Sequence, residues 1–176
     1  MRTFPVIRTP PPPAEIPCSE ITAGLHDLRA MTKYTQGINM WKELRLSNRI
    51  EELEKIKDAI QDLIQSQPAF AEAEFEMNLI AEELFVNVIH HAFRDNLLHK
   101  ILMSLSVDED QWEIVVEDDG VPFDPTKAPE ANIGLPLNER GVGGLGIHLI
   151  RKTAHEFLYE RKANHNIVRV RKKMHS

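Results

Sequence analysis

The stretch that decides the fold is ELFVNVIHHAF, residues 83–93. Glu83, Asn87 and His91 recur every four residues, which places all three on one face of a helix. The core-facing side of this helix is expected to come from four apolar residues: Leu79, Leu84, Val88 and Ile89. A polar stripe on an otherwise apolar helix indicates a site, and a plain solvated helix face is the alternative with the same spacing.

The chemistry of this stripe suits a nucleotide. The amide oxygen of Asn87 can ligate a hard cation such as Mg²⁺. The carboxylate of Glu83, one turn earlier, can orient or deprotonate an attacking hydroxyl group. Carboxylate and carboxamide together therefore predict a site for a metal-bound phosphate compound.

Further elements extend from this helix in both directions, with apolar periods of two for strands and about 3.6 for helices. Asn48 followed by Glu51 resembles a helix N-cap, and the closing turn is placed at Asn164 and His165. The elements are expected, in order, as a strand at 38–46, helices at 50–67 and 72–93, strands at 101–107 and 112–118, a loop, a helix from 146, and strands at 156–161 and 166–171. This order predicts a two-layer α/β (α+β) sandwich: one mixed, mostly antiparallel sheet covered on one face by three helices.

A second motif, DDGVPF at residues 118–123, follows the end of a predicted strand. The carboxylate of Asp118 can accept a hydrogen bond from the exocyclic amine of adenine, whereas guanine carries an oxygen at that place that a carboxylate would repel. Gly120 lets the backbone come close to the base. Because Asp-Gly is a common turn pair, a plain turn is the alternative.

A third motif, GVGGLG at residues 141–146, opens the next predicted helix. Free backbone N–H groups and the positive end of a helix dipole bind phosphate. A flexible hinge or a helix cap is the alternative. The GxGxxG pattern of dinucleotide-binding folds and the Gly-Lys-Ser/Thr ending of a P-loop are both absent, and the motif follows a long irregular stretch instead of a strand.

Composition bounds the function classes. The chain has 176 residues, 42% of them hydrophobic, with a formal net charge of −6 and one cysteine, Cys18. An acidic chain is a poor electrostatic partner for nucleic acid, and a single cysteine excludes an internal disulfide. No apolar run predicts a membrane span and no signal peptide is evident, so a cytoplasmic protein is expected. The run of prolines at 10–13 predicts an extended arm over residues 1–38, followed by one domain over residues 39–176.

In their order and spacing, the three motifs resemble the N, G1 and G2 boxes of the GHKL (Bergerat-fold) ATPases, which include gyrase B, Hsp90, MutL and histidine kinases. Within that superfamily, the amino-acid sequences of residues 44–53, 83–93 and 144–151 are similar to the corresponding motifs of the anti-sigma-factor serine kinases. The resemblance covers roughly residues 40–173. It implies the Bergerat fold and the binding of ATP and Mg²⁺.

The resemblance also implies a role for each motif residue. Glu83 would be the general base and Asn87 the Mg²⁺ ligand. Asp118 would read adenine, Gly120 would shape its pocket, and residues 124–140 would form a lid over ATP. The full ATP-binding set that it implies is Asn87, His91, Asp118, Gly120, Pro122, Phe123, Arg140, Gly141, Gly143, Gly144, Leu145 and Gly146.

For partners, the resemblance implies a STAS-type anti-anti-sigma protein that is phosphorylated on serine, a sigma factor, and a homodimer. Two alternatives stay open. The domain could be an ATP-gated binding module with little turnover. It could also be a sensor-kinase fragment, because residues 26–29 resemble a phosphoacceptor box around His26; that box lacks its usual proline and has Met31 there. The closing hairpin also lacks the Gly-Thr pair often seen in histidine kinases.

Overall fold

The computed structural model describes residues 38–108, 110–127 and 145–174. The extended arm predicted at residues 1–38 therefore lies outside the described residues, except for Ile38. The regular elements are β1 (Ile38–Ser47), η1 (Ile50–Glu52), α2 (Leu53–Ser66), η2 (Pro68–Ala73), α3 (Glu74–His91), β2 (Lys100–Asp108), β3 (Gln111–Asp118), η3 (Pro125–Lys127), α4 (Leu145–Thr153), β4 (Glu156–Lys162) and β5 (His165–Lys173). None of the described helices is long and apolar enough to cross a membrane.

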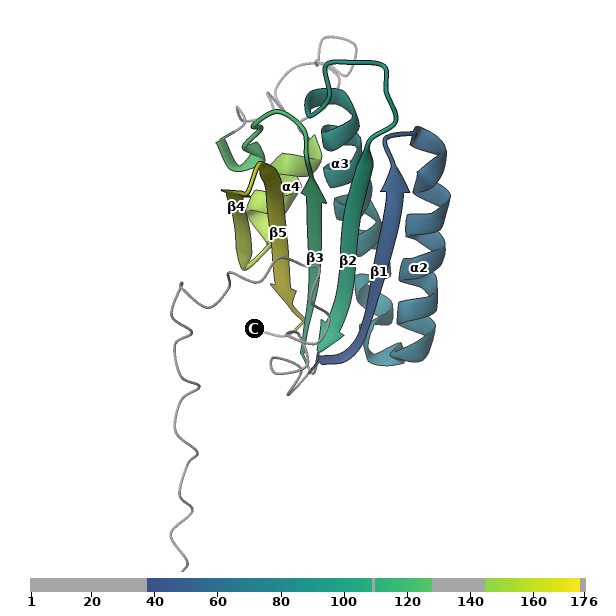
Figure 1. Ribbon diagram of the computed structural model, residues 1–176. Coiled ribbons are helices and arrows are strands. Elements are labelled where there is room, and N and C mark those ends of the chain that lie inside the picture. Colours follow the sequence, from purple (N-terminus) through teal and green to yellow (C-terminus); the bar gives the residue numbers. More distant parts are fainter. Residues whose placement is uncertain (1–37, 109, 128–144, 175–176) are drawn as a thin grey trace, which may run out of the picture. The chain divides into compact units, whose positions relative to one another are not determined.

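The strands form one sheet in the order β1-β2-β3-β5-β4. Figure 1 shows helices α2, α3 and α4 together on one face of this sheet. The predicted two-layer α/β sandwich is confirmed. Whereas a mixed sheet was expected, all four neighbouring pairs among the described strands are antiparallel.

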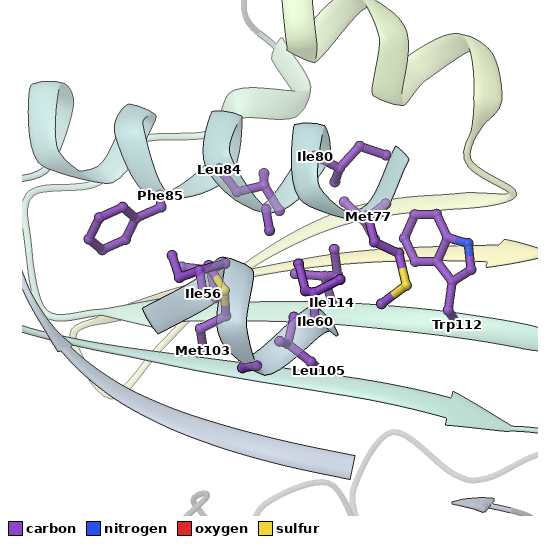
Figure 2. Close-up of a cluster of buried hydrophobic side chains, with 14 of the residues drawn as sticks. Ile56, Ile60, Met77, Ile80, Leu84, Phe85, Met103, Leu105, Trp112 and Ile114 are labelled. Carbon is purple, nitrogen blue, oxygen red and sulfur yellow. The ribbon is translucent and has the colours of Figure 1, made fainter. Parts of the chain in front are cut away.

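The core lies between the sheet and the helices. Side chains of β2 alternate between buried and partly exposed along the strand, which is the period-two pattern of a sheet with one covered face. Figure 2 shows core side chains of α2 and α3 pointing toward those of β2 and β3, with Trp112 at one end of the cluster. Ile60, Met77, Leu105 and Trp112 are completely buried. Each such side chain contributes about 1.5–3 kcal/mol of hydrophobic stabilisation.

Truncating one of these side chains tests the packing. We expect Ile60→Ala to lower the free energy of unfolding by about 2–5 kcal/mol, because the lost methyl groups leave a cavity that the layers cannot close. Urea titration of the purified variant measures this change. Ile50→Ala is the matched control, since Ile50 is 51% exposed, and it should cost about 0.5 kcal/mol or less. Equal costs for the two variants would contradict the described core.

The predicted N-cap at Asn48 is wrong. The first turn after β1 is the short helix η1. Its N-cap residue is Arg49, and no side chain makes a capping hydrogen bond there. Asn48 instead donates from Nδ2 to the carbonyl oxygen of Leu97 (3.0 Å) and accepts from the backbone N–H of His99 (3.0 Å). Its side chain thus joins the end of β1 to the segment just before β2, a contact across about 50 residues that local spacing cannot reveal.

The closing turn is one residue earlier than predicted. Lys162 pairs with His165 across β4 and β5, so only Ala163 and Asn164 form the turn. Both residues have positive φ, 48° and 69°. A two-residue turn with two positive φ angles matches the right-handed twist of a hairpin. His165 therefore belongs to β5, and Asn166 shares the buried side of β5 with Val168 and Val170.

Candidate functional site

The polar stripe of α3 lies in the helix layer next to α4. Glu83 and Asn87 are partly buried and His91 is exposed. The amide Nδ2 of Asn87 donates to Oε1 of Glu83 at 3.2 Å. This bond fixes the amide orientation, so the Oδ1 atom of Asn87 is left to accept or to ligate. Leu79, expected in the core, is 37% exposed, because it lies four residues before Glu83 on the same stripe.

The start of α4 lies directly against Glu83. Gly146 is the second residue of α4, and a Cβ atom built on it would overlap Cβ, Cγ and Cδ of the Glu83 side chain. Only a glycine therefore lets the first turn of α4 approach α3 this closely. The first N–H groups of a helix have no partners within it and carry the positive end of its dipole. Glu83 thus lies beside a helix end that favours anions.

This close approach gives a prediction for Gly146→Ala. The helix itself should tolerate the change, because alanine is the better helix former by about 1 kcal/mol. The added methyl group must displace the Glu83 carboxylate or α4. We expect the melting temperature to stay within a few degrees while any activity that depends on Glu83 falls about tenfold or more. Calorimetric melting and an activity assay on the same sample measure both, and unchanged activity would contradict the described contact.

Asp118 lies at the end of β3 and is 3% exposed. Its Oδ1 atom accepts two hydrogen bonds of 2.8 Å, from the backbone N–H of Gly120 and from Nδ2 of Asn166. Burial removes water from the carboxylate and raises its pKa above the ordinary value of 3.8, although these two hydrogen bonds act in the opposite direction. A buried carboxylate whose pKa is shifted by desolvation is typical of a functional site.

A narrow pocket joins Asp118 to the α3 stripe. It is lined by Leu84, Asn87, Val88, Ala92, Val116, Asp118, Phe123, Pro125 and Val168. Apart from Asn87 and Asp118 the lining is apolar, which suits a flat base recognised at one edge. The free volume is about 10 Å³, roughly the room of one water molecule.

The segment after Asp118 is held against the end of α3. The backbone N–H of Val121 donates to the carbonyl oxygen of Ala92 at 2.7 Å. A Cβ atom on Gly120 would overlap the backbone of Ala92, so this close approach requires glycine. The ring of Phe123 stacks on that of His91 with centroids 4.7 Å apart. These contacts bring the second motif onto the first.

The beginning of the predicted lid is also anchored. Asp124 accepts hydrogen bonds from the backbone N–H and the hydroxyl of Thr126, at 3.0 and 2.6 Å. Arg151 of α4 donates to the carbonyl oxygen of Thr126 at 2.8 Å. The short helix η3 is therefore fixed to α4. The rest of the predicted lid, residues 128–140, lies outside the described residues.

The structure brings together most of the described residues that the sequence singled out: Glu83, Asn87, His91, Asp118, Gly120, Phe123 and Gly146. Pro122 is exposed beside them, and Leu145 begins α4. Arg140, Gly141, Gly143 and Gly144 lie outside the described residues.

Sequence reasoning missed Asn166. The signal was present, because Asn166 shares the core-facing phase of β5 with Val168 and Val170, where a polar side chain needs a partner.

The residues of the site could hold Mg²⁺ only together with the phosphates of a bound nucleotide. No group of three or more His, Cys, Asp or Glu side chains that could hold a metal occurs within the described ranges. Mg²⁺ commonly keeps several waters and binds through one or two protein oxygens plus substrate phosphates. The Oδ1 atom of Asn87, oriented by Glu83, can supply one such oxygen.

Comparison with known proteins identifies the family of this chain and two of its relatives. Residues 46–172 match the family model described as a histidine kinase-like ATPase domain. The serine/threonine-protein kinase BtrW of Bordetella bronchiseptica is 28% identical over 96 residues, 54% of this chain and 68% of that protein. The serine-protein kinase RsbW of Bacillus cereus strain AH187 is 29% identical over 92 residues, 49% of this chain and 57% of that protein. The alignment thus spans little more than half the length of RsbW.

Proposed function

Because the chain belongs to the histidine kinase-like ATPase domain family, we propose that it is an ATP-dependent serine/threonine protein kinase that acts as an anti-sigma regulatory factor. A domain of this family implies ATP binding. The two relatives are named as serine or serine/threonine kinases, and the proposal carries that activity to this chain. Its substrate would be a serine on a STAS-type anti-anti-sigma protein. A sigma factor would be the second partner, bound by a homodimer.

The observation that carries this proposal is the position of Glu83. Its carboxylate is bonded to Asn87 on one side and packed against Gly146 at the start of α4 on the other. An acceptor for a proton, an amide oxygen for a cation and a helix end for phosphate thus meet within two turns of α3. Phosphoryl transfer needs these three functions in one place, because its catalysis is mainly positioning and charge neutralisation.

Each residue then has a role in transfer. Asp118 accepts a hydrogen bond from the adenine amine, and the first turn of α4 with residues 141–146 holds phosphates. Asn87 would hold Mg²⁺, whose chemistry is to neutralise phosphate charge. Glu83 accepts the proton of the serine hydroxyl as its oxygen bonds to the γ-phosphorus. The bond from that phosphorus to the bridging oxygen breaks, and ADP leaves with the electron pair.

The proposal is tested with γ-labelled ATP and Mg²⁺. The purified chain is incubated alone and with each STAS-type protein of the same genome, and acid-stable label is followed. Label on a serine of one of these proteins supports the proposal. Nucleotide binding without transfer to any candidate overturns it in favour of an ATP-gated binding module. Acid-labile label on the chain itself overturns it in favour of a histidine kinase, and His26→Ala would then remove that label.

A further inference from the structure

The buried side-chain amide of Asn166 is hydrogen-bonded to the carboxylate of Asp118. Asn166 is 1% exposed and lies directly opposite Asp118 in the register of β3 and β5. Asp118 and Asn166 are the two buried polar or charged residues of the described ranges. All the polar atoms of the Asn166 side chain are engaged. Such a complete network has a defined geometry that neither residue would keep alone.

The partners of Asn166 leave one orientation for its amide. Its Oδ1 atom accepts from Nη1 of Arg161 at 2.7 Å and from the hydroxyl of Tyr159 at 2.9 Å. Its Nδ2 atom donates to Oδ1 of Asp118 at 2.8 Å and to the carbonyl oxygen of Val121 at 3.0 Å. A guanidinium can only donate, and a carboxylate or carbonyl can only accept. A flipped amide would therefore place its NH₂ group against the Arg161 donor and its oxygen against the two acceptors.

This arrangement leaves one oxygen of Asp118 for a ligand. Oδ1 already accepts from Asn166 and from the backbone N–H of Gly120, which uses its two lone pairs. Within the described residues, Oδ2 has no hydrogen-bond partner on the protein and is the acceptor left for a ligand. Arg161 also donates to the carbonyl oxygen of Gly120 at 3.0 Å, so the same side chain also holds the backbone segment that follows Asp118.

We infer that Asn166 is a positioning residue that sets the base specificity of the site, with Arg161 and Tyr159 holding its amide in place. It turns Asp118 so that one oxygen is saturated and the other accepts from an exocyclic amine of a purine. The inference rests on the proposed nucleotide site and concerns the base alone. The phosphate groups bind elsewhere, along α3 and α4.

The test compares ATP with inosine triphosphate, which carries an oxygen in place of the 6-amino group. Titration calorimetry of the full chain with each nucleotide and Mg²⁺ gives the ratio of affinities. The wild type should prefer ATP by about tenfold or more, the usual value of a hydrogen bond to a charged group. In Asn166→Leu this preference should fall at least about fivefold, mostly through weaker ATP binding.

Two further variants make the test decisive. Tyr159→Phe removes one of the two donors to Oδ1 of Asn166 and keeps the fold, so a smaller loss of preference, about two- to fivefold, is expected even if Asn166→Leu does not fold. Asn164→Gly, in the turn of the same hairpin, is the control. It should leave the preference unchanged, since glycine accepts the positive φ of 69°.

The other outcomes separate the two proposals. If Asn166→Leu and Tyr159→Phe weaken ATP and inosine triphosphate by the same factor, Asn166 is only structural, and the inference fails while the nucleotide site stands. Equal affinities of the wild type for both nucleotides would overturn base selection by Asp118. A wild type that binds neither nucleotide would overturn the proposed function itself.

Discussion

Replacing Glu83 by glutamine is expected to lower the rate of phosphoryl transfer about 100-fold or more, the usual contribution of a general base. Glutamine keeps the size of the side chain and can still accept the hydrogen bond from Asn87. It cannot take up the proton of the serine hydroxyl. ATP affinity should therefore stay within about threefold of wild type. Single-turnover transfer of γ-label and titration calorimetry measure the two quantities.

Glu82→Gln is the matched control for this variant. Glu82 precedes Glu83 on α3 but is exposed and makes no described hydrogen bond or ion pair. Its replacement removes the same charge from the same helix without touching the site. Wild-type transfer in Glu82→Gln beside lost transfer in Glu83→Gln would localise the effect to one carboxylate. Equal losses in both would show that only the charge of the helix matters, which contradicts a role for Glu83 as base.

Asp118→Asn is expected to weaken ATP binding at least about 30-fold, because an amide N–H replaces the acceptor that faces the adenine amine. The protein should nevertheless be as stable as wild type or more stable at neutral pH. The asparagine oxygen can still accept from Gly120 and Asn166. Calorimetric titration with ATP and thermal melting of the same sample test both parts.

The sign of the stability effect follows from the raised pKa of Asp118. The folded protein binds the carboxyl proton more tightly than the unfolded chain, whose pKa is near 3.8. The free energy of unfolding therefore falls as the pH rises from 3.8 through the raised pKa, and it stays at the lower value above it. A neutral asparagine removes this cost. A large loss of stability at neutral pH in Asp118→Asn would contradict a raised pKa of Asp118.

Asp119→Asn is the control for Asp118→Asn. The Asp119 side chain is 55% exposed, and the Nδ1 atom of His99 lies 3.7 Å from its Oδ1 atom. Its replacement should leave ATP affinity within about threefold of wild type. If Asp119→Asn loses ATP as strongly as Asp118→Asn, the adenine contact has been assigned to the wrong carboxylate.

The parts of the fold that the sequence predicted well depend on local periodicity. The alternation of Ile101, Met103, Leu105 and Val107 appears as the buried side of β2, and the spacing of Glu83 and Asn87 gives the observed hydrogen bond. Both follow from the geometry of one element. The sandwich could be predicted because each element buries one face.

What the sequence did not reveal depends on contacts between distant residues. The role of Asn48 is set by residues 97–99. The role of Asn166 is set by Asp118, 48 positions earlier. The turn at Ala163 and Asn164 follows from the pairing of β4 with β5. Leu79 was assigned to the core by its apolar character, but tertiary packing leaves it exposed. For Asn48, Asn166 and the turn, the deciding contacts join residues that local spacing does not relate.

The measurement that tests the central claim most directly is transfer of the γ-phosphate to a STAS-type partner in a single turnover. The partner is incubated with wild type, Glu83→Gln or Glu82→Gln, each loaded with ATP and Mg²⁺, and the modified residue is mapped by mass spectrometry. The account predicts phosphate on one serine with wild type and Glu82→Gln, and at least about 100-fold slower transfer with Glu83→Gln. Equal transfer by all three proteins, or bound ATP with no phosphate on any partner, would contradict it.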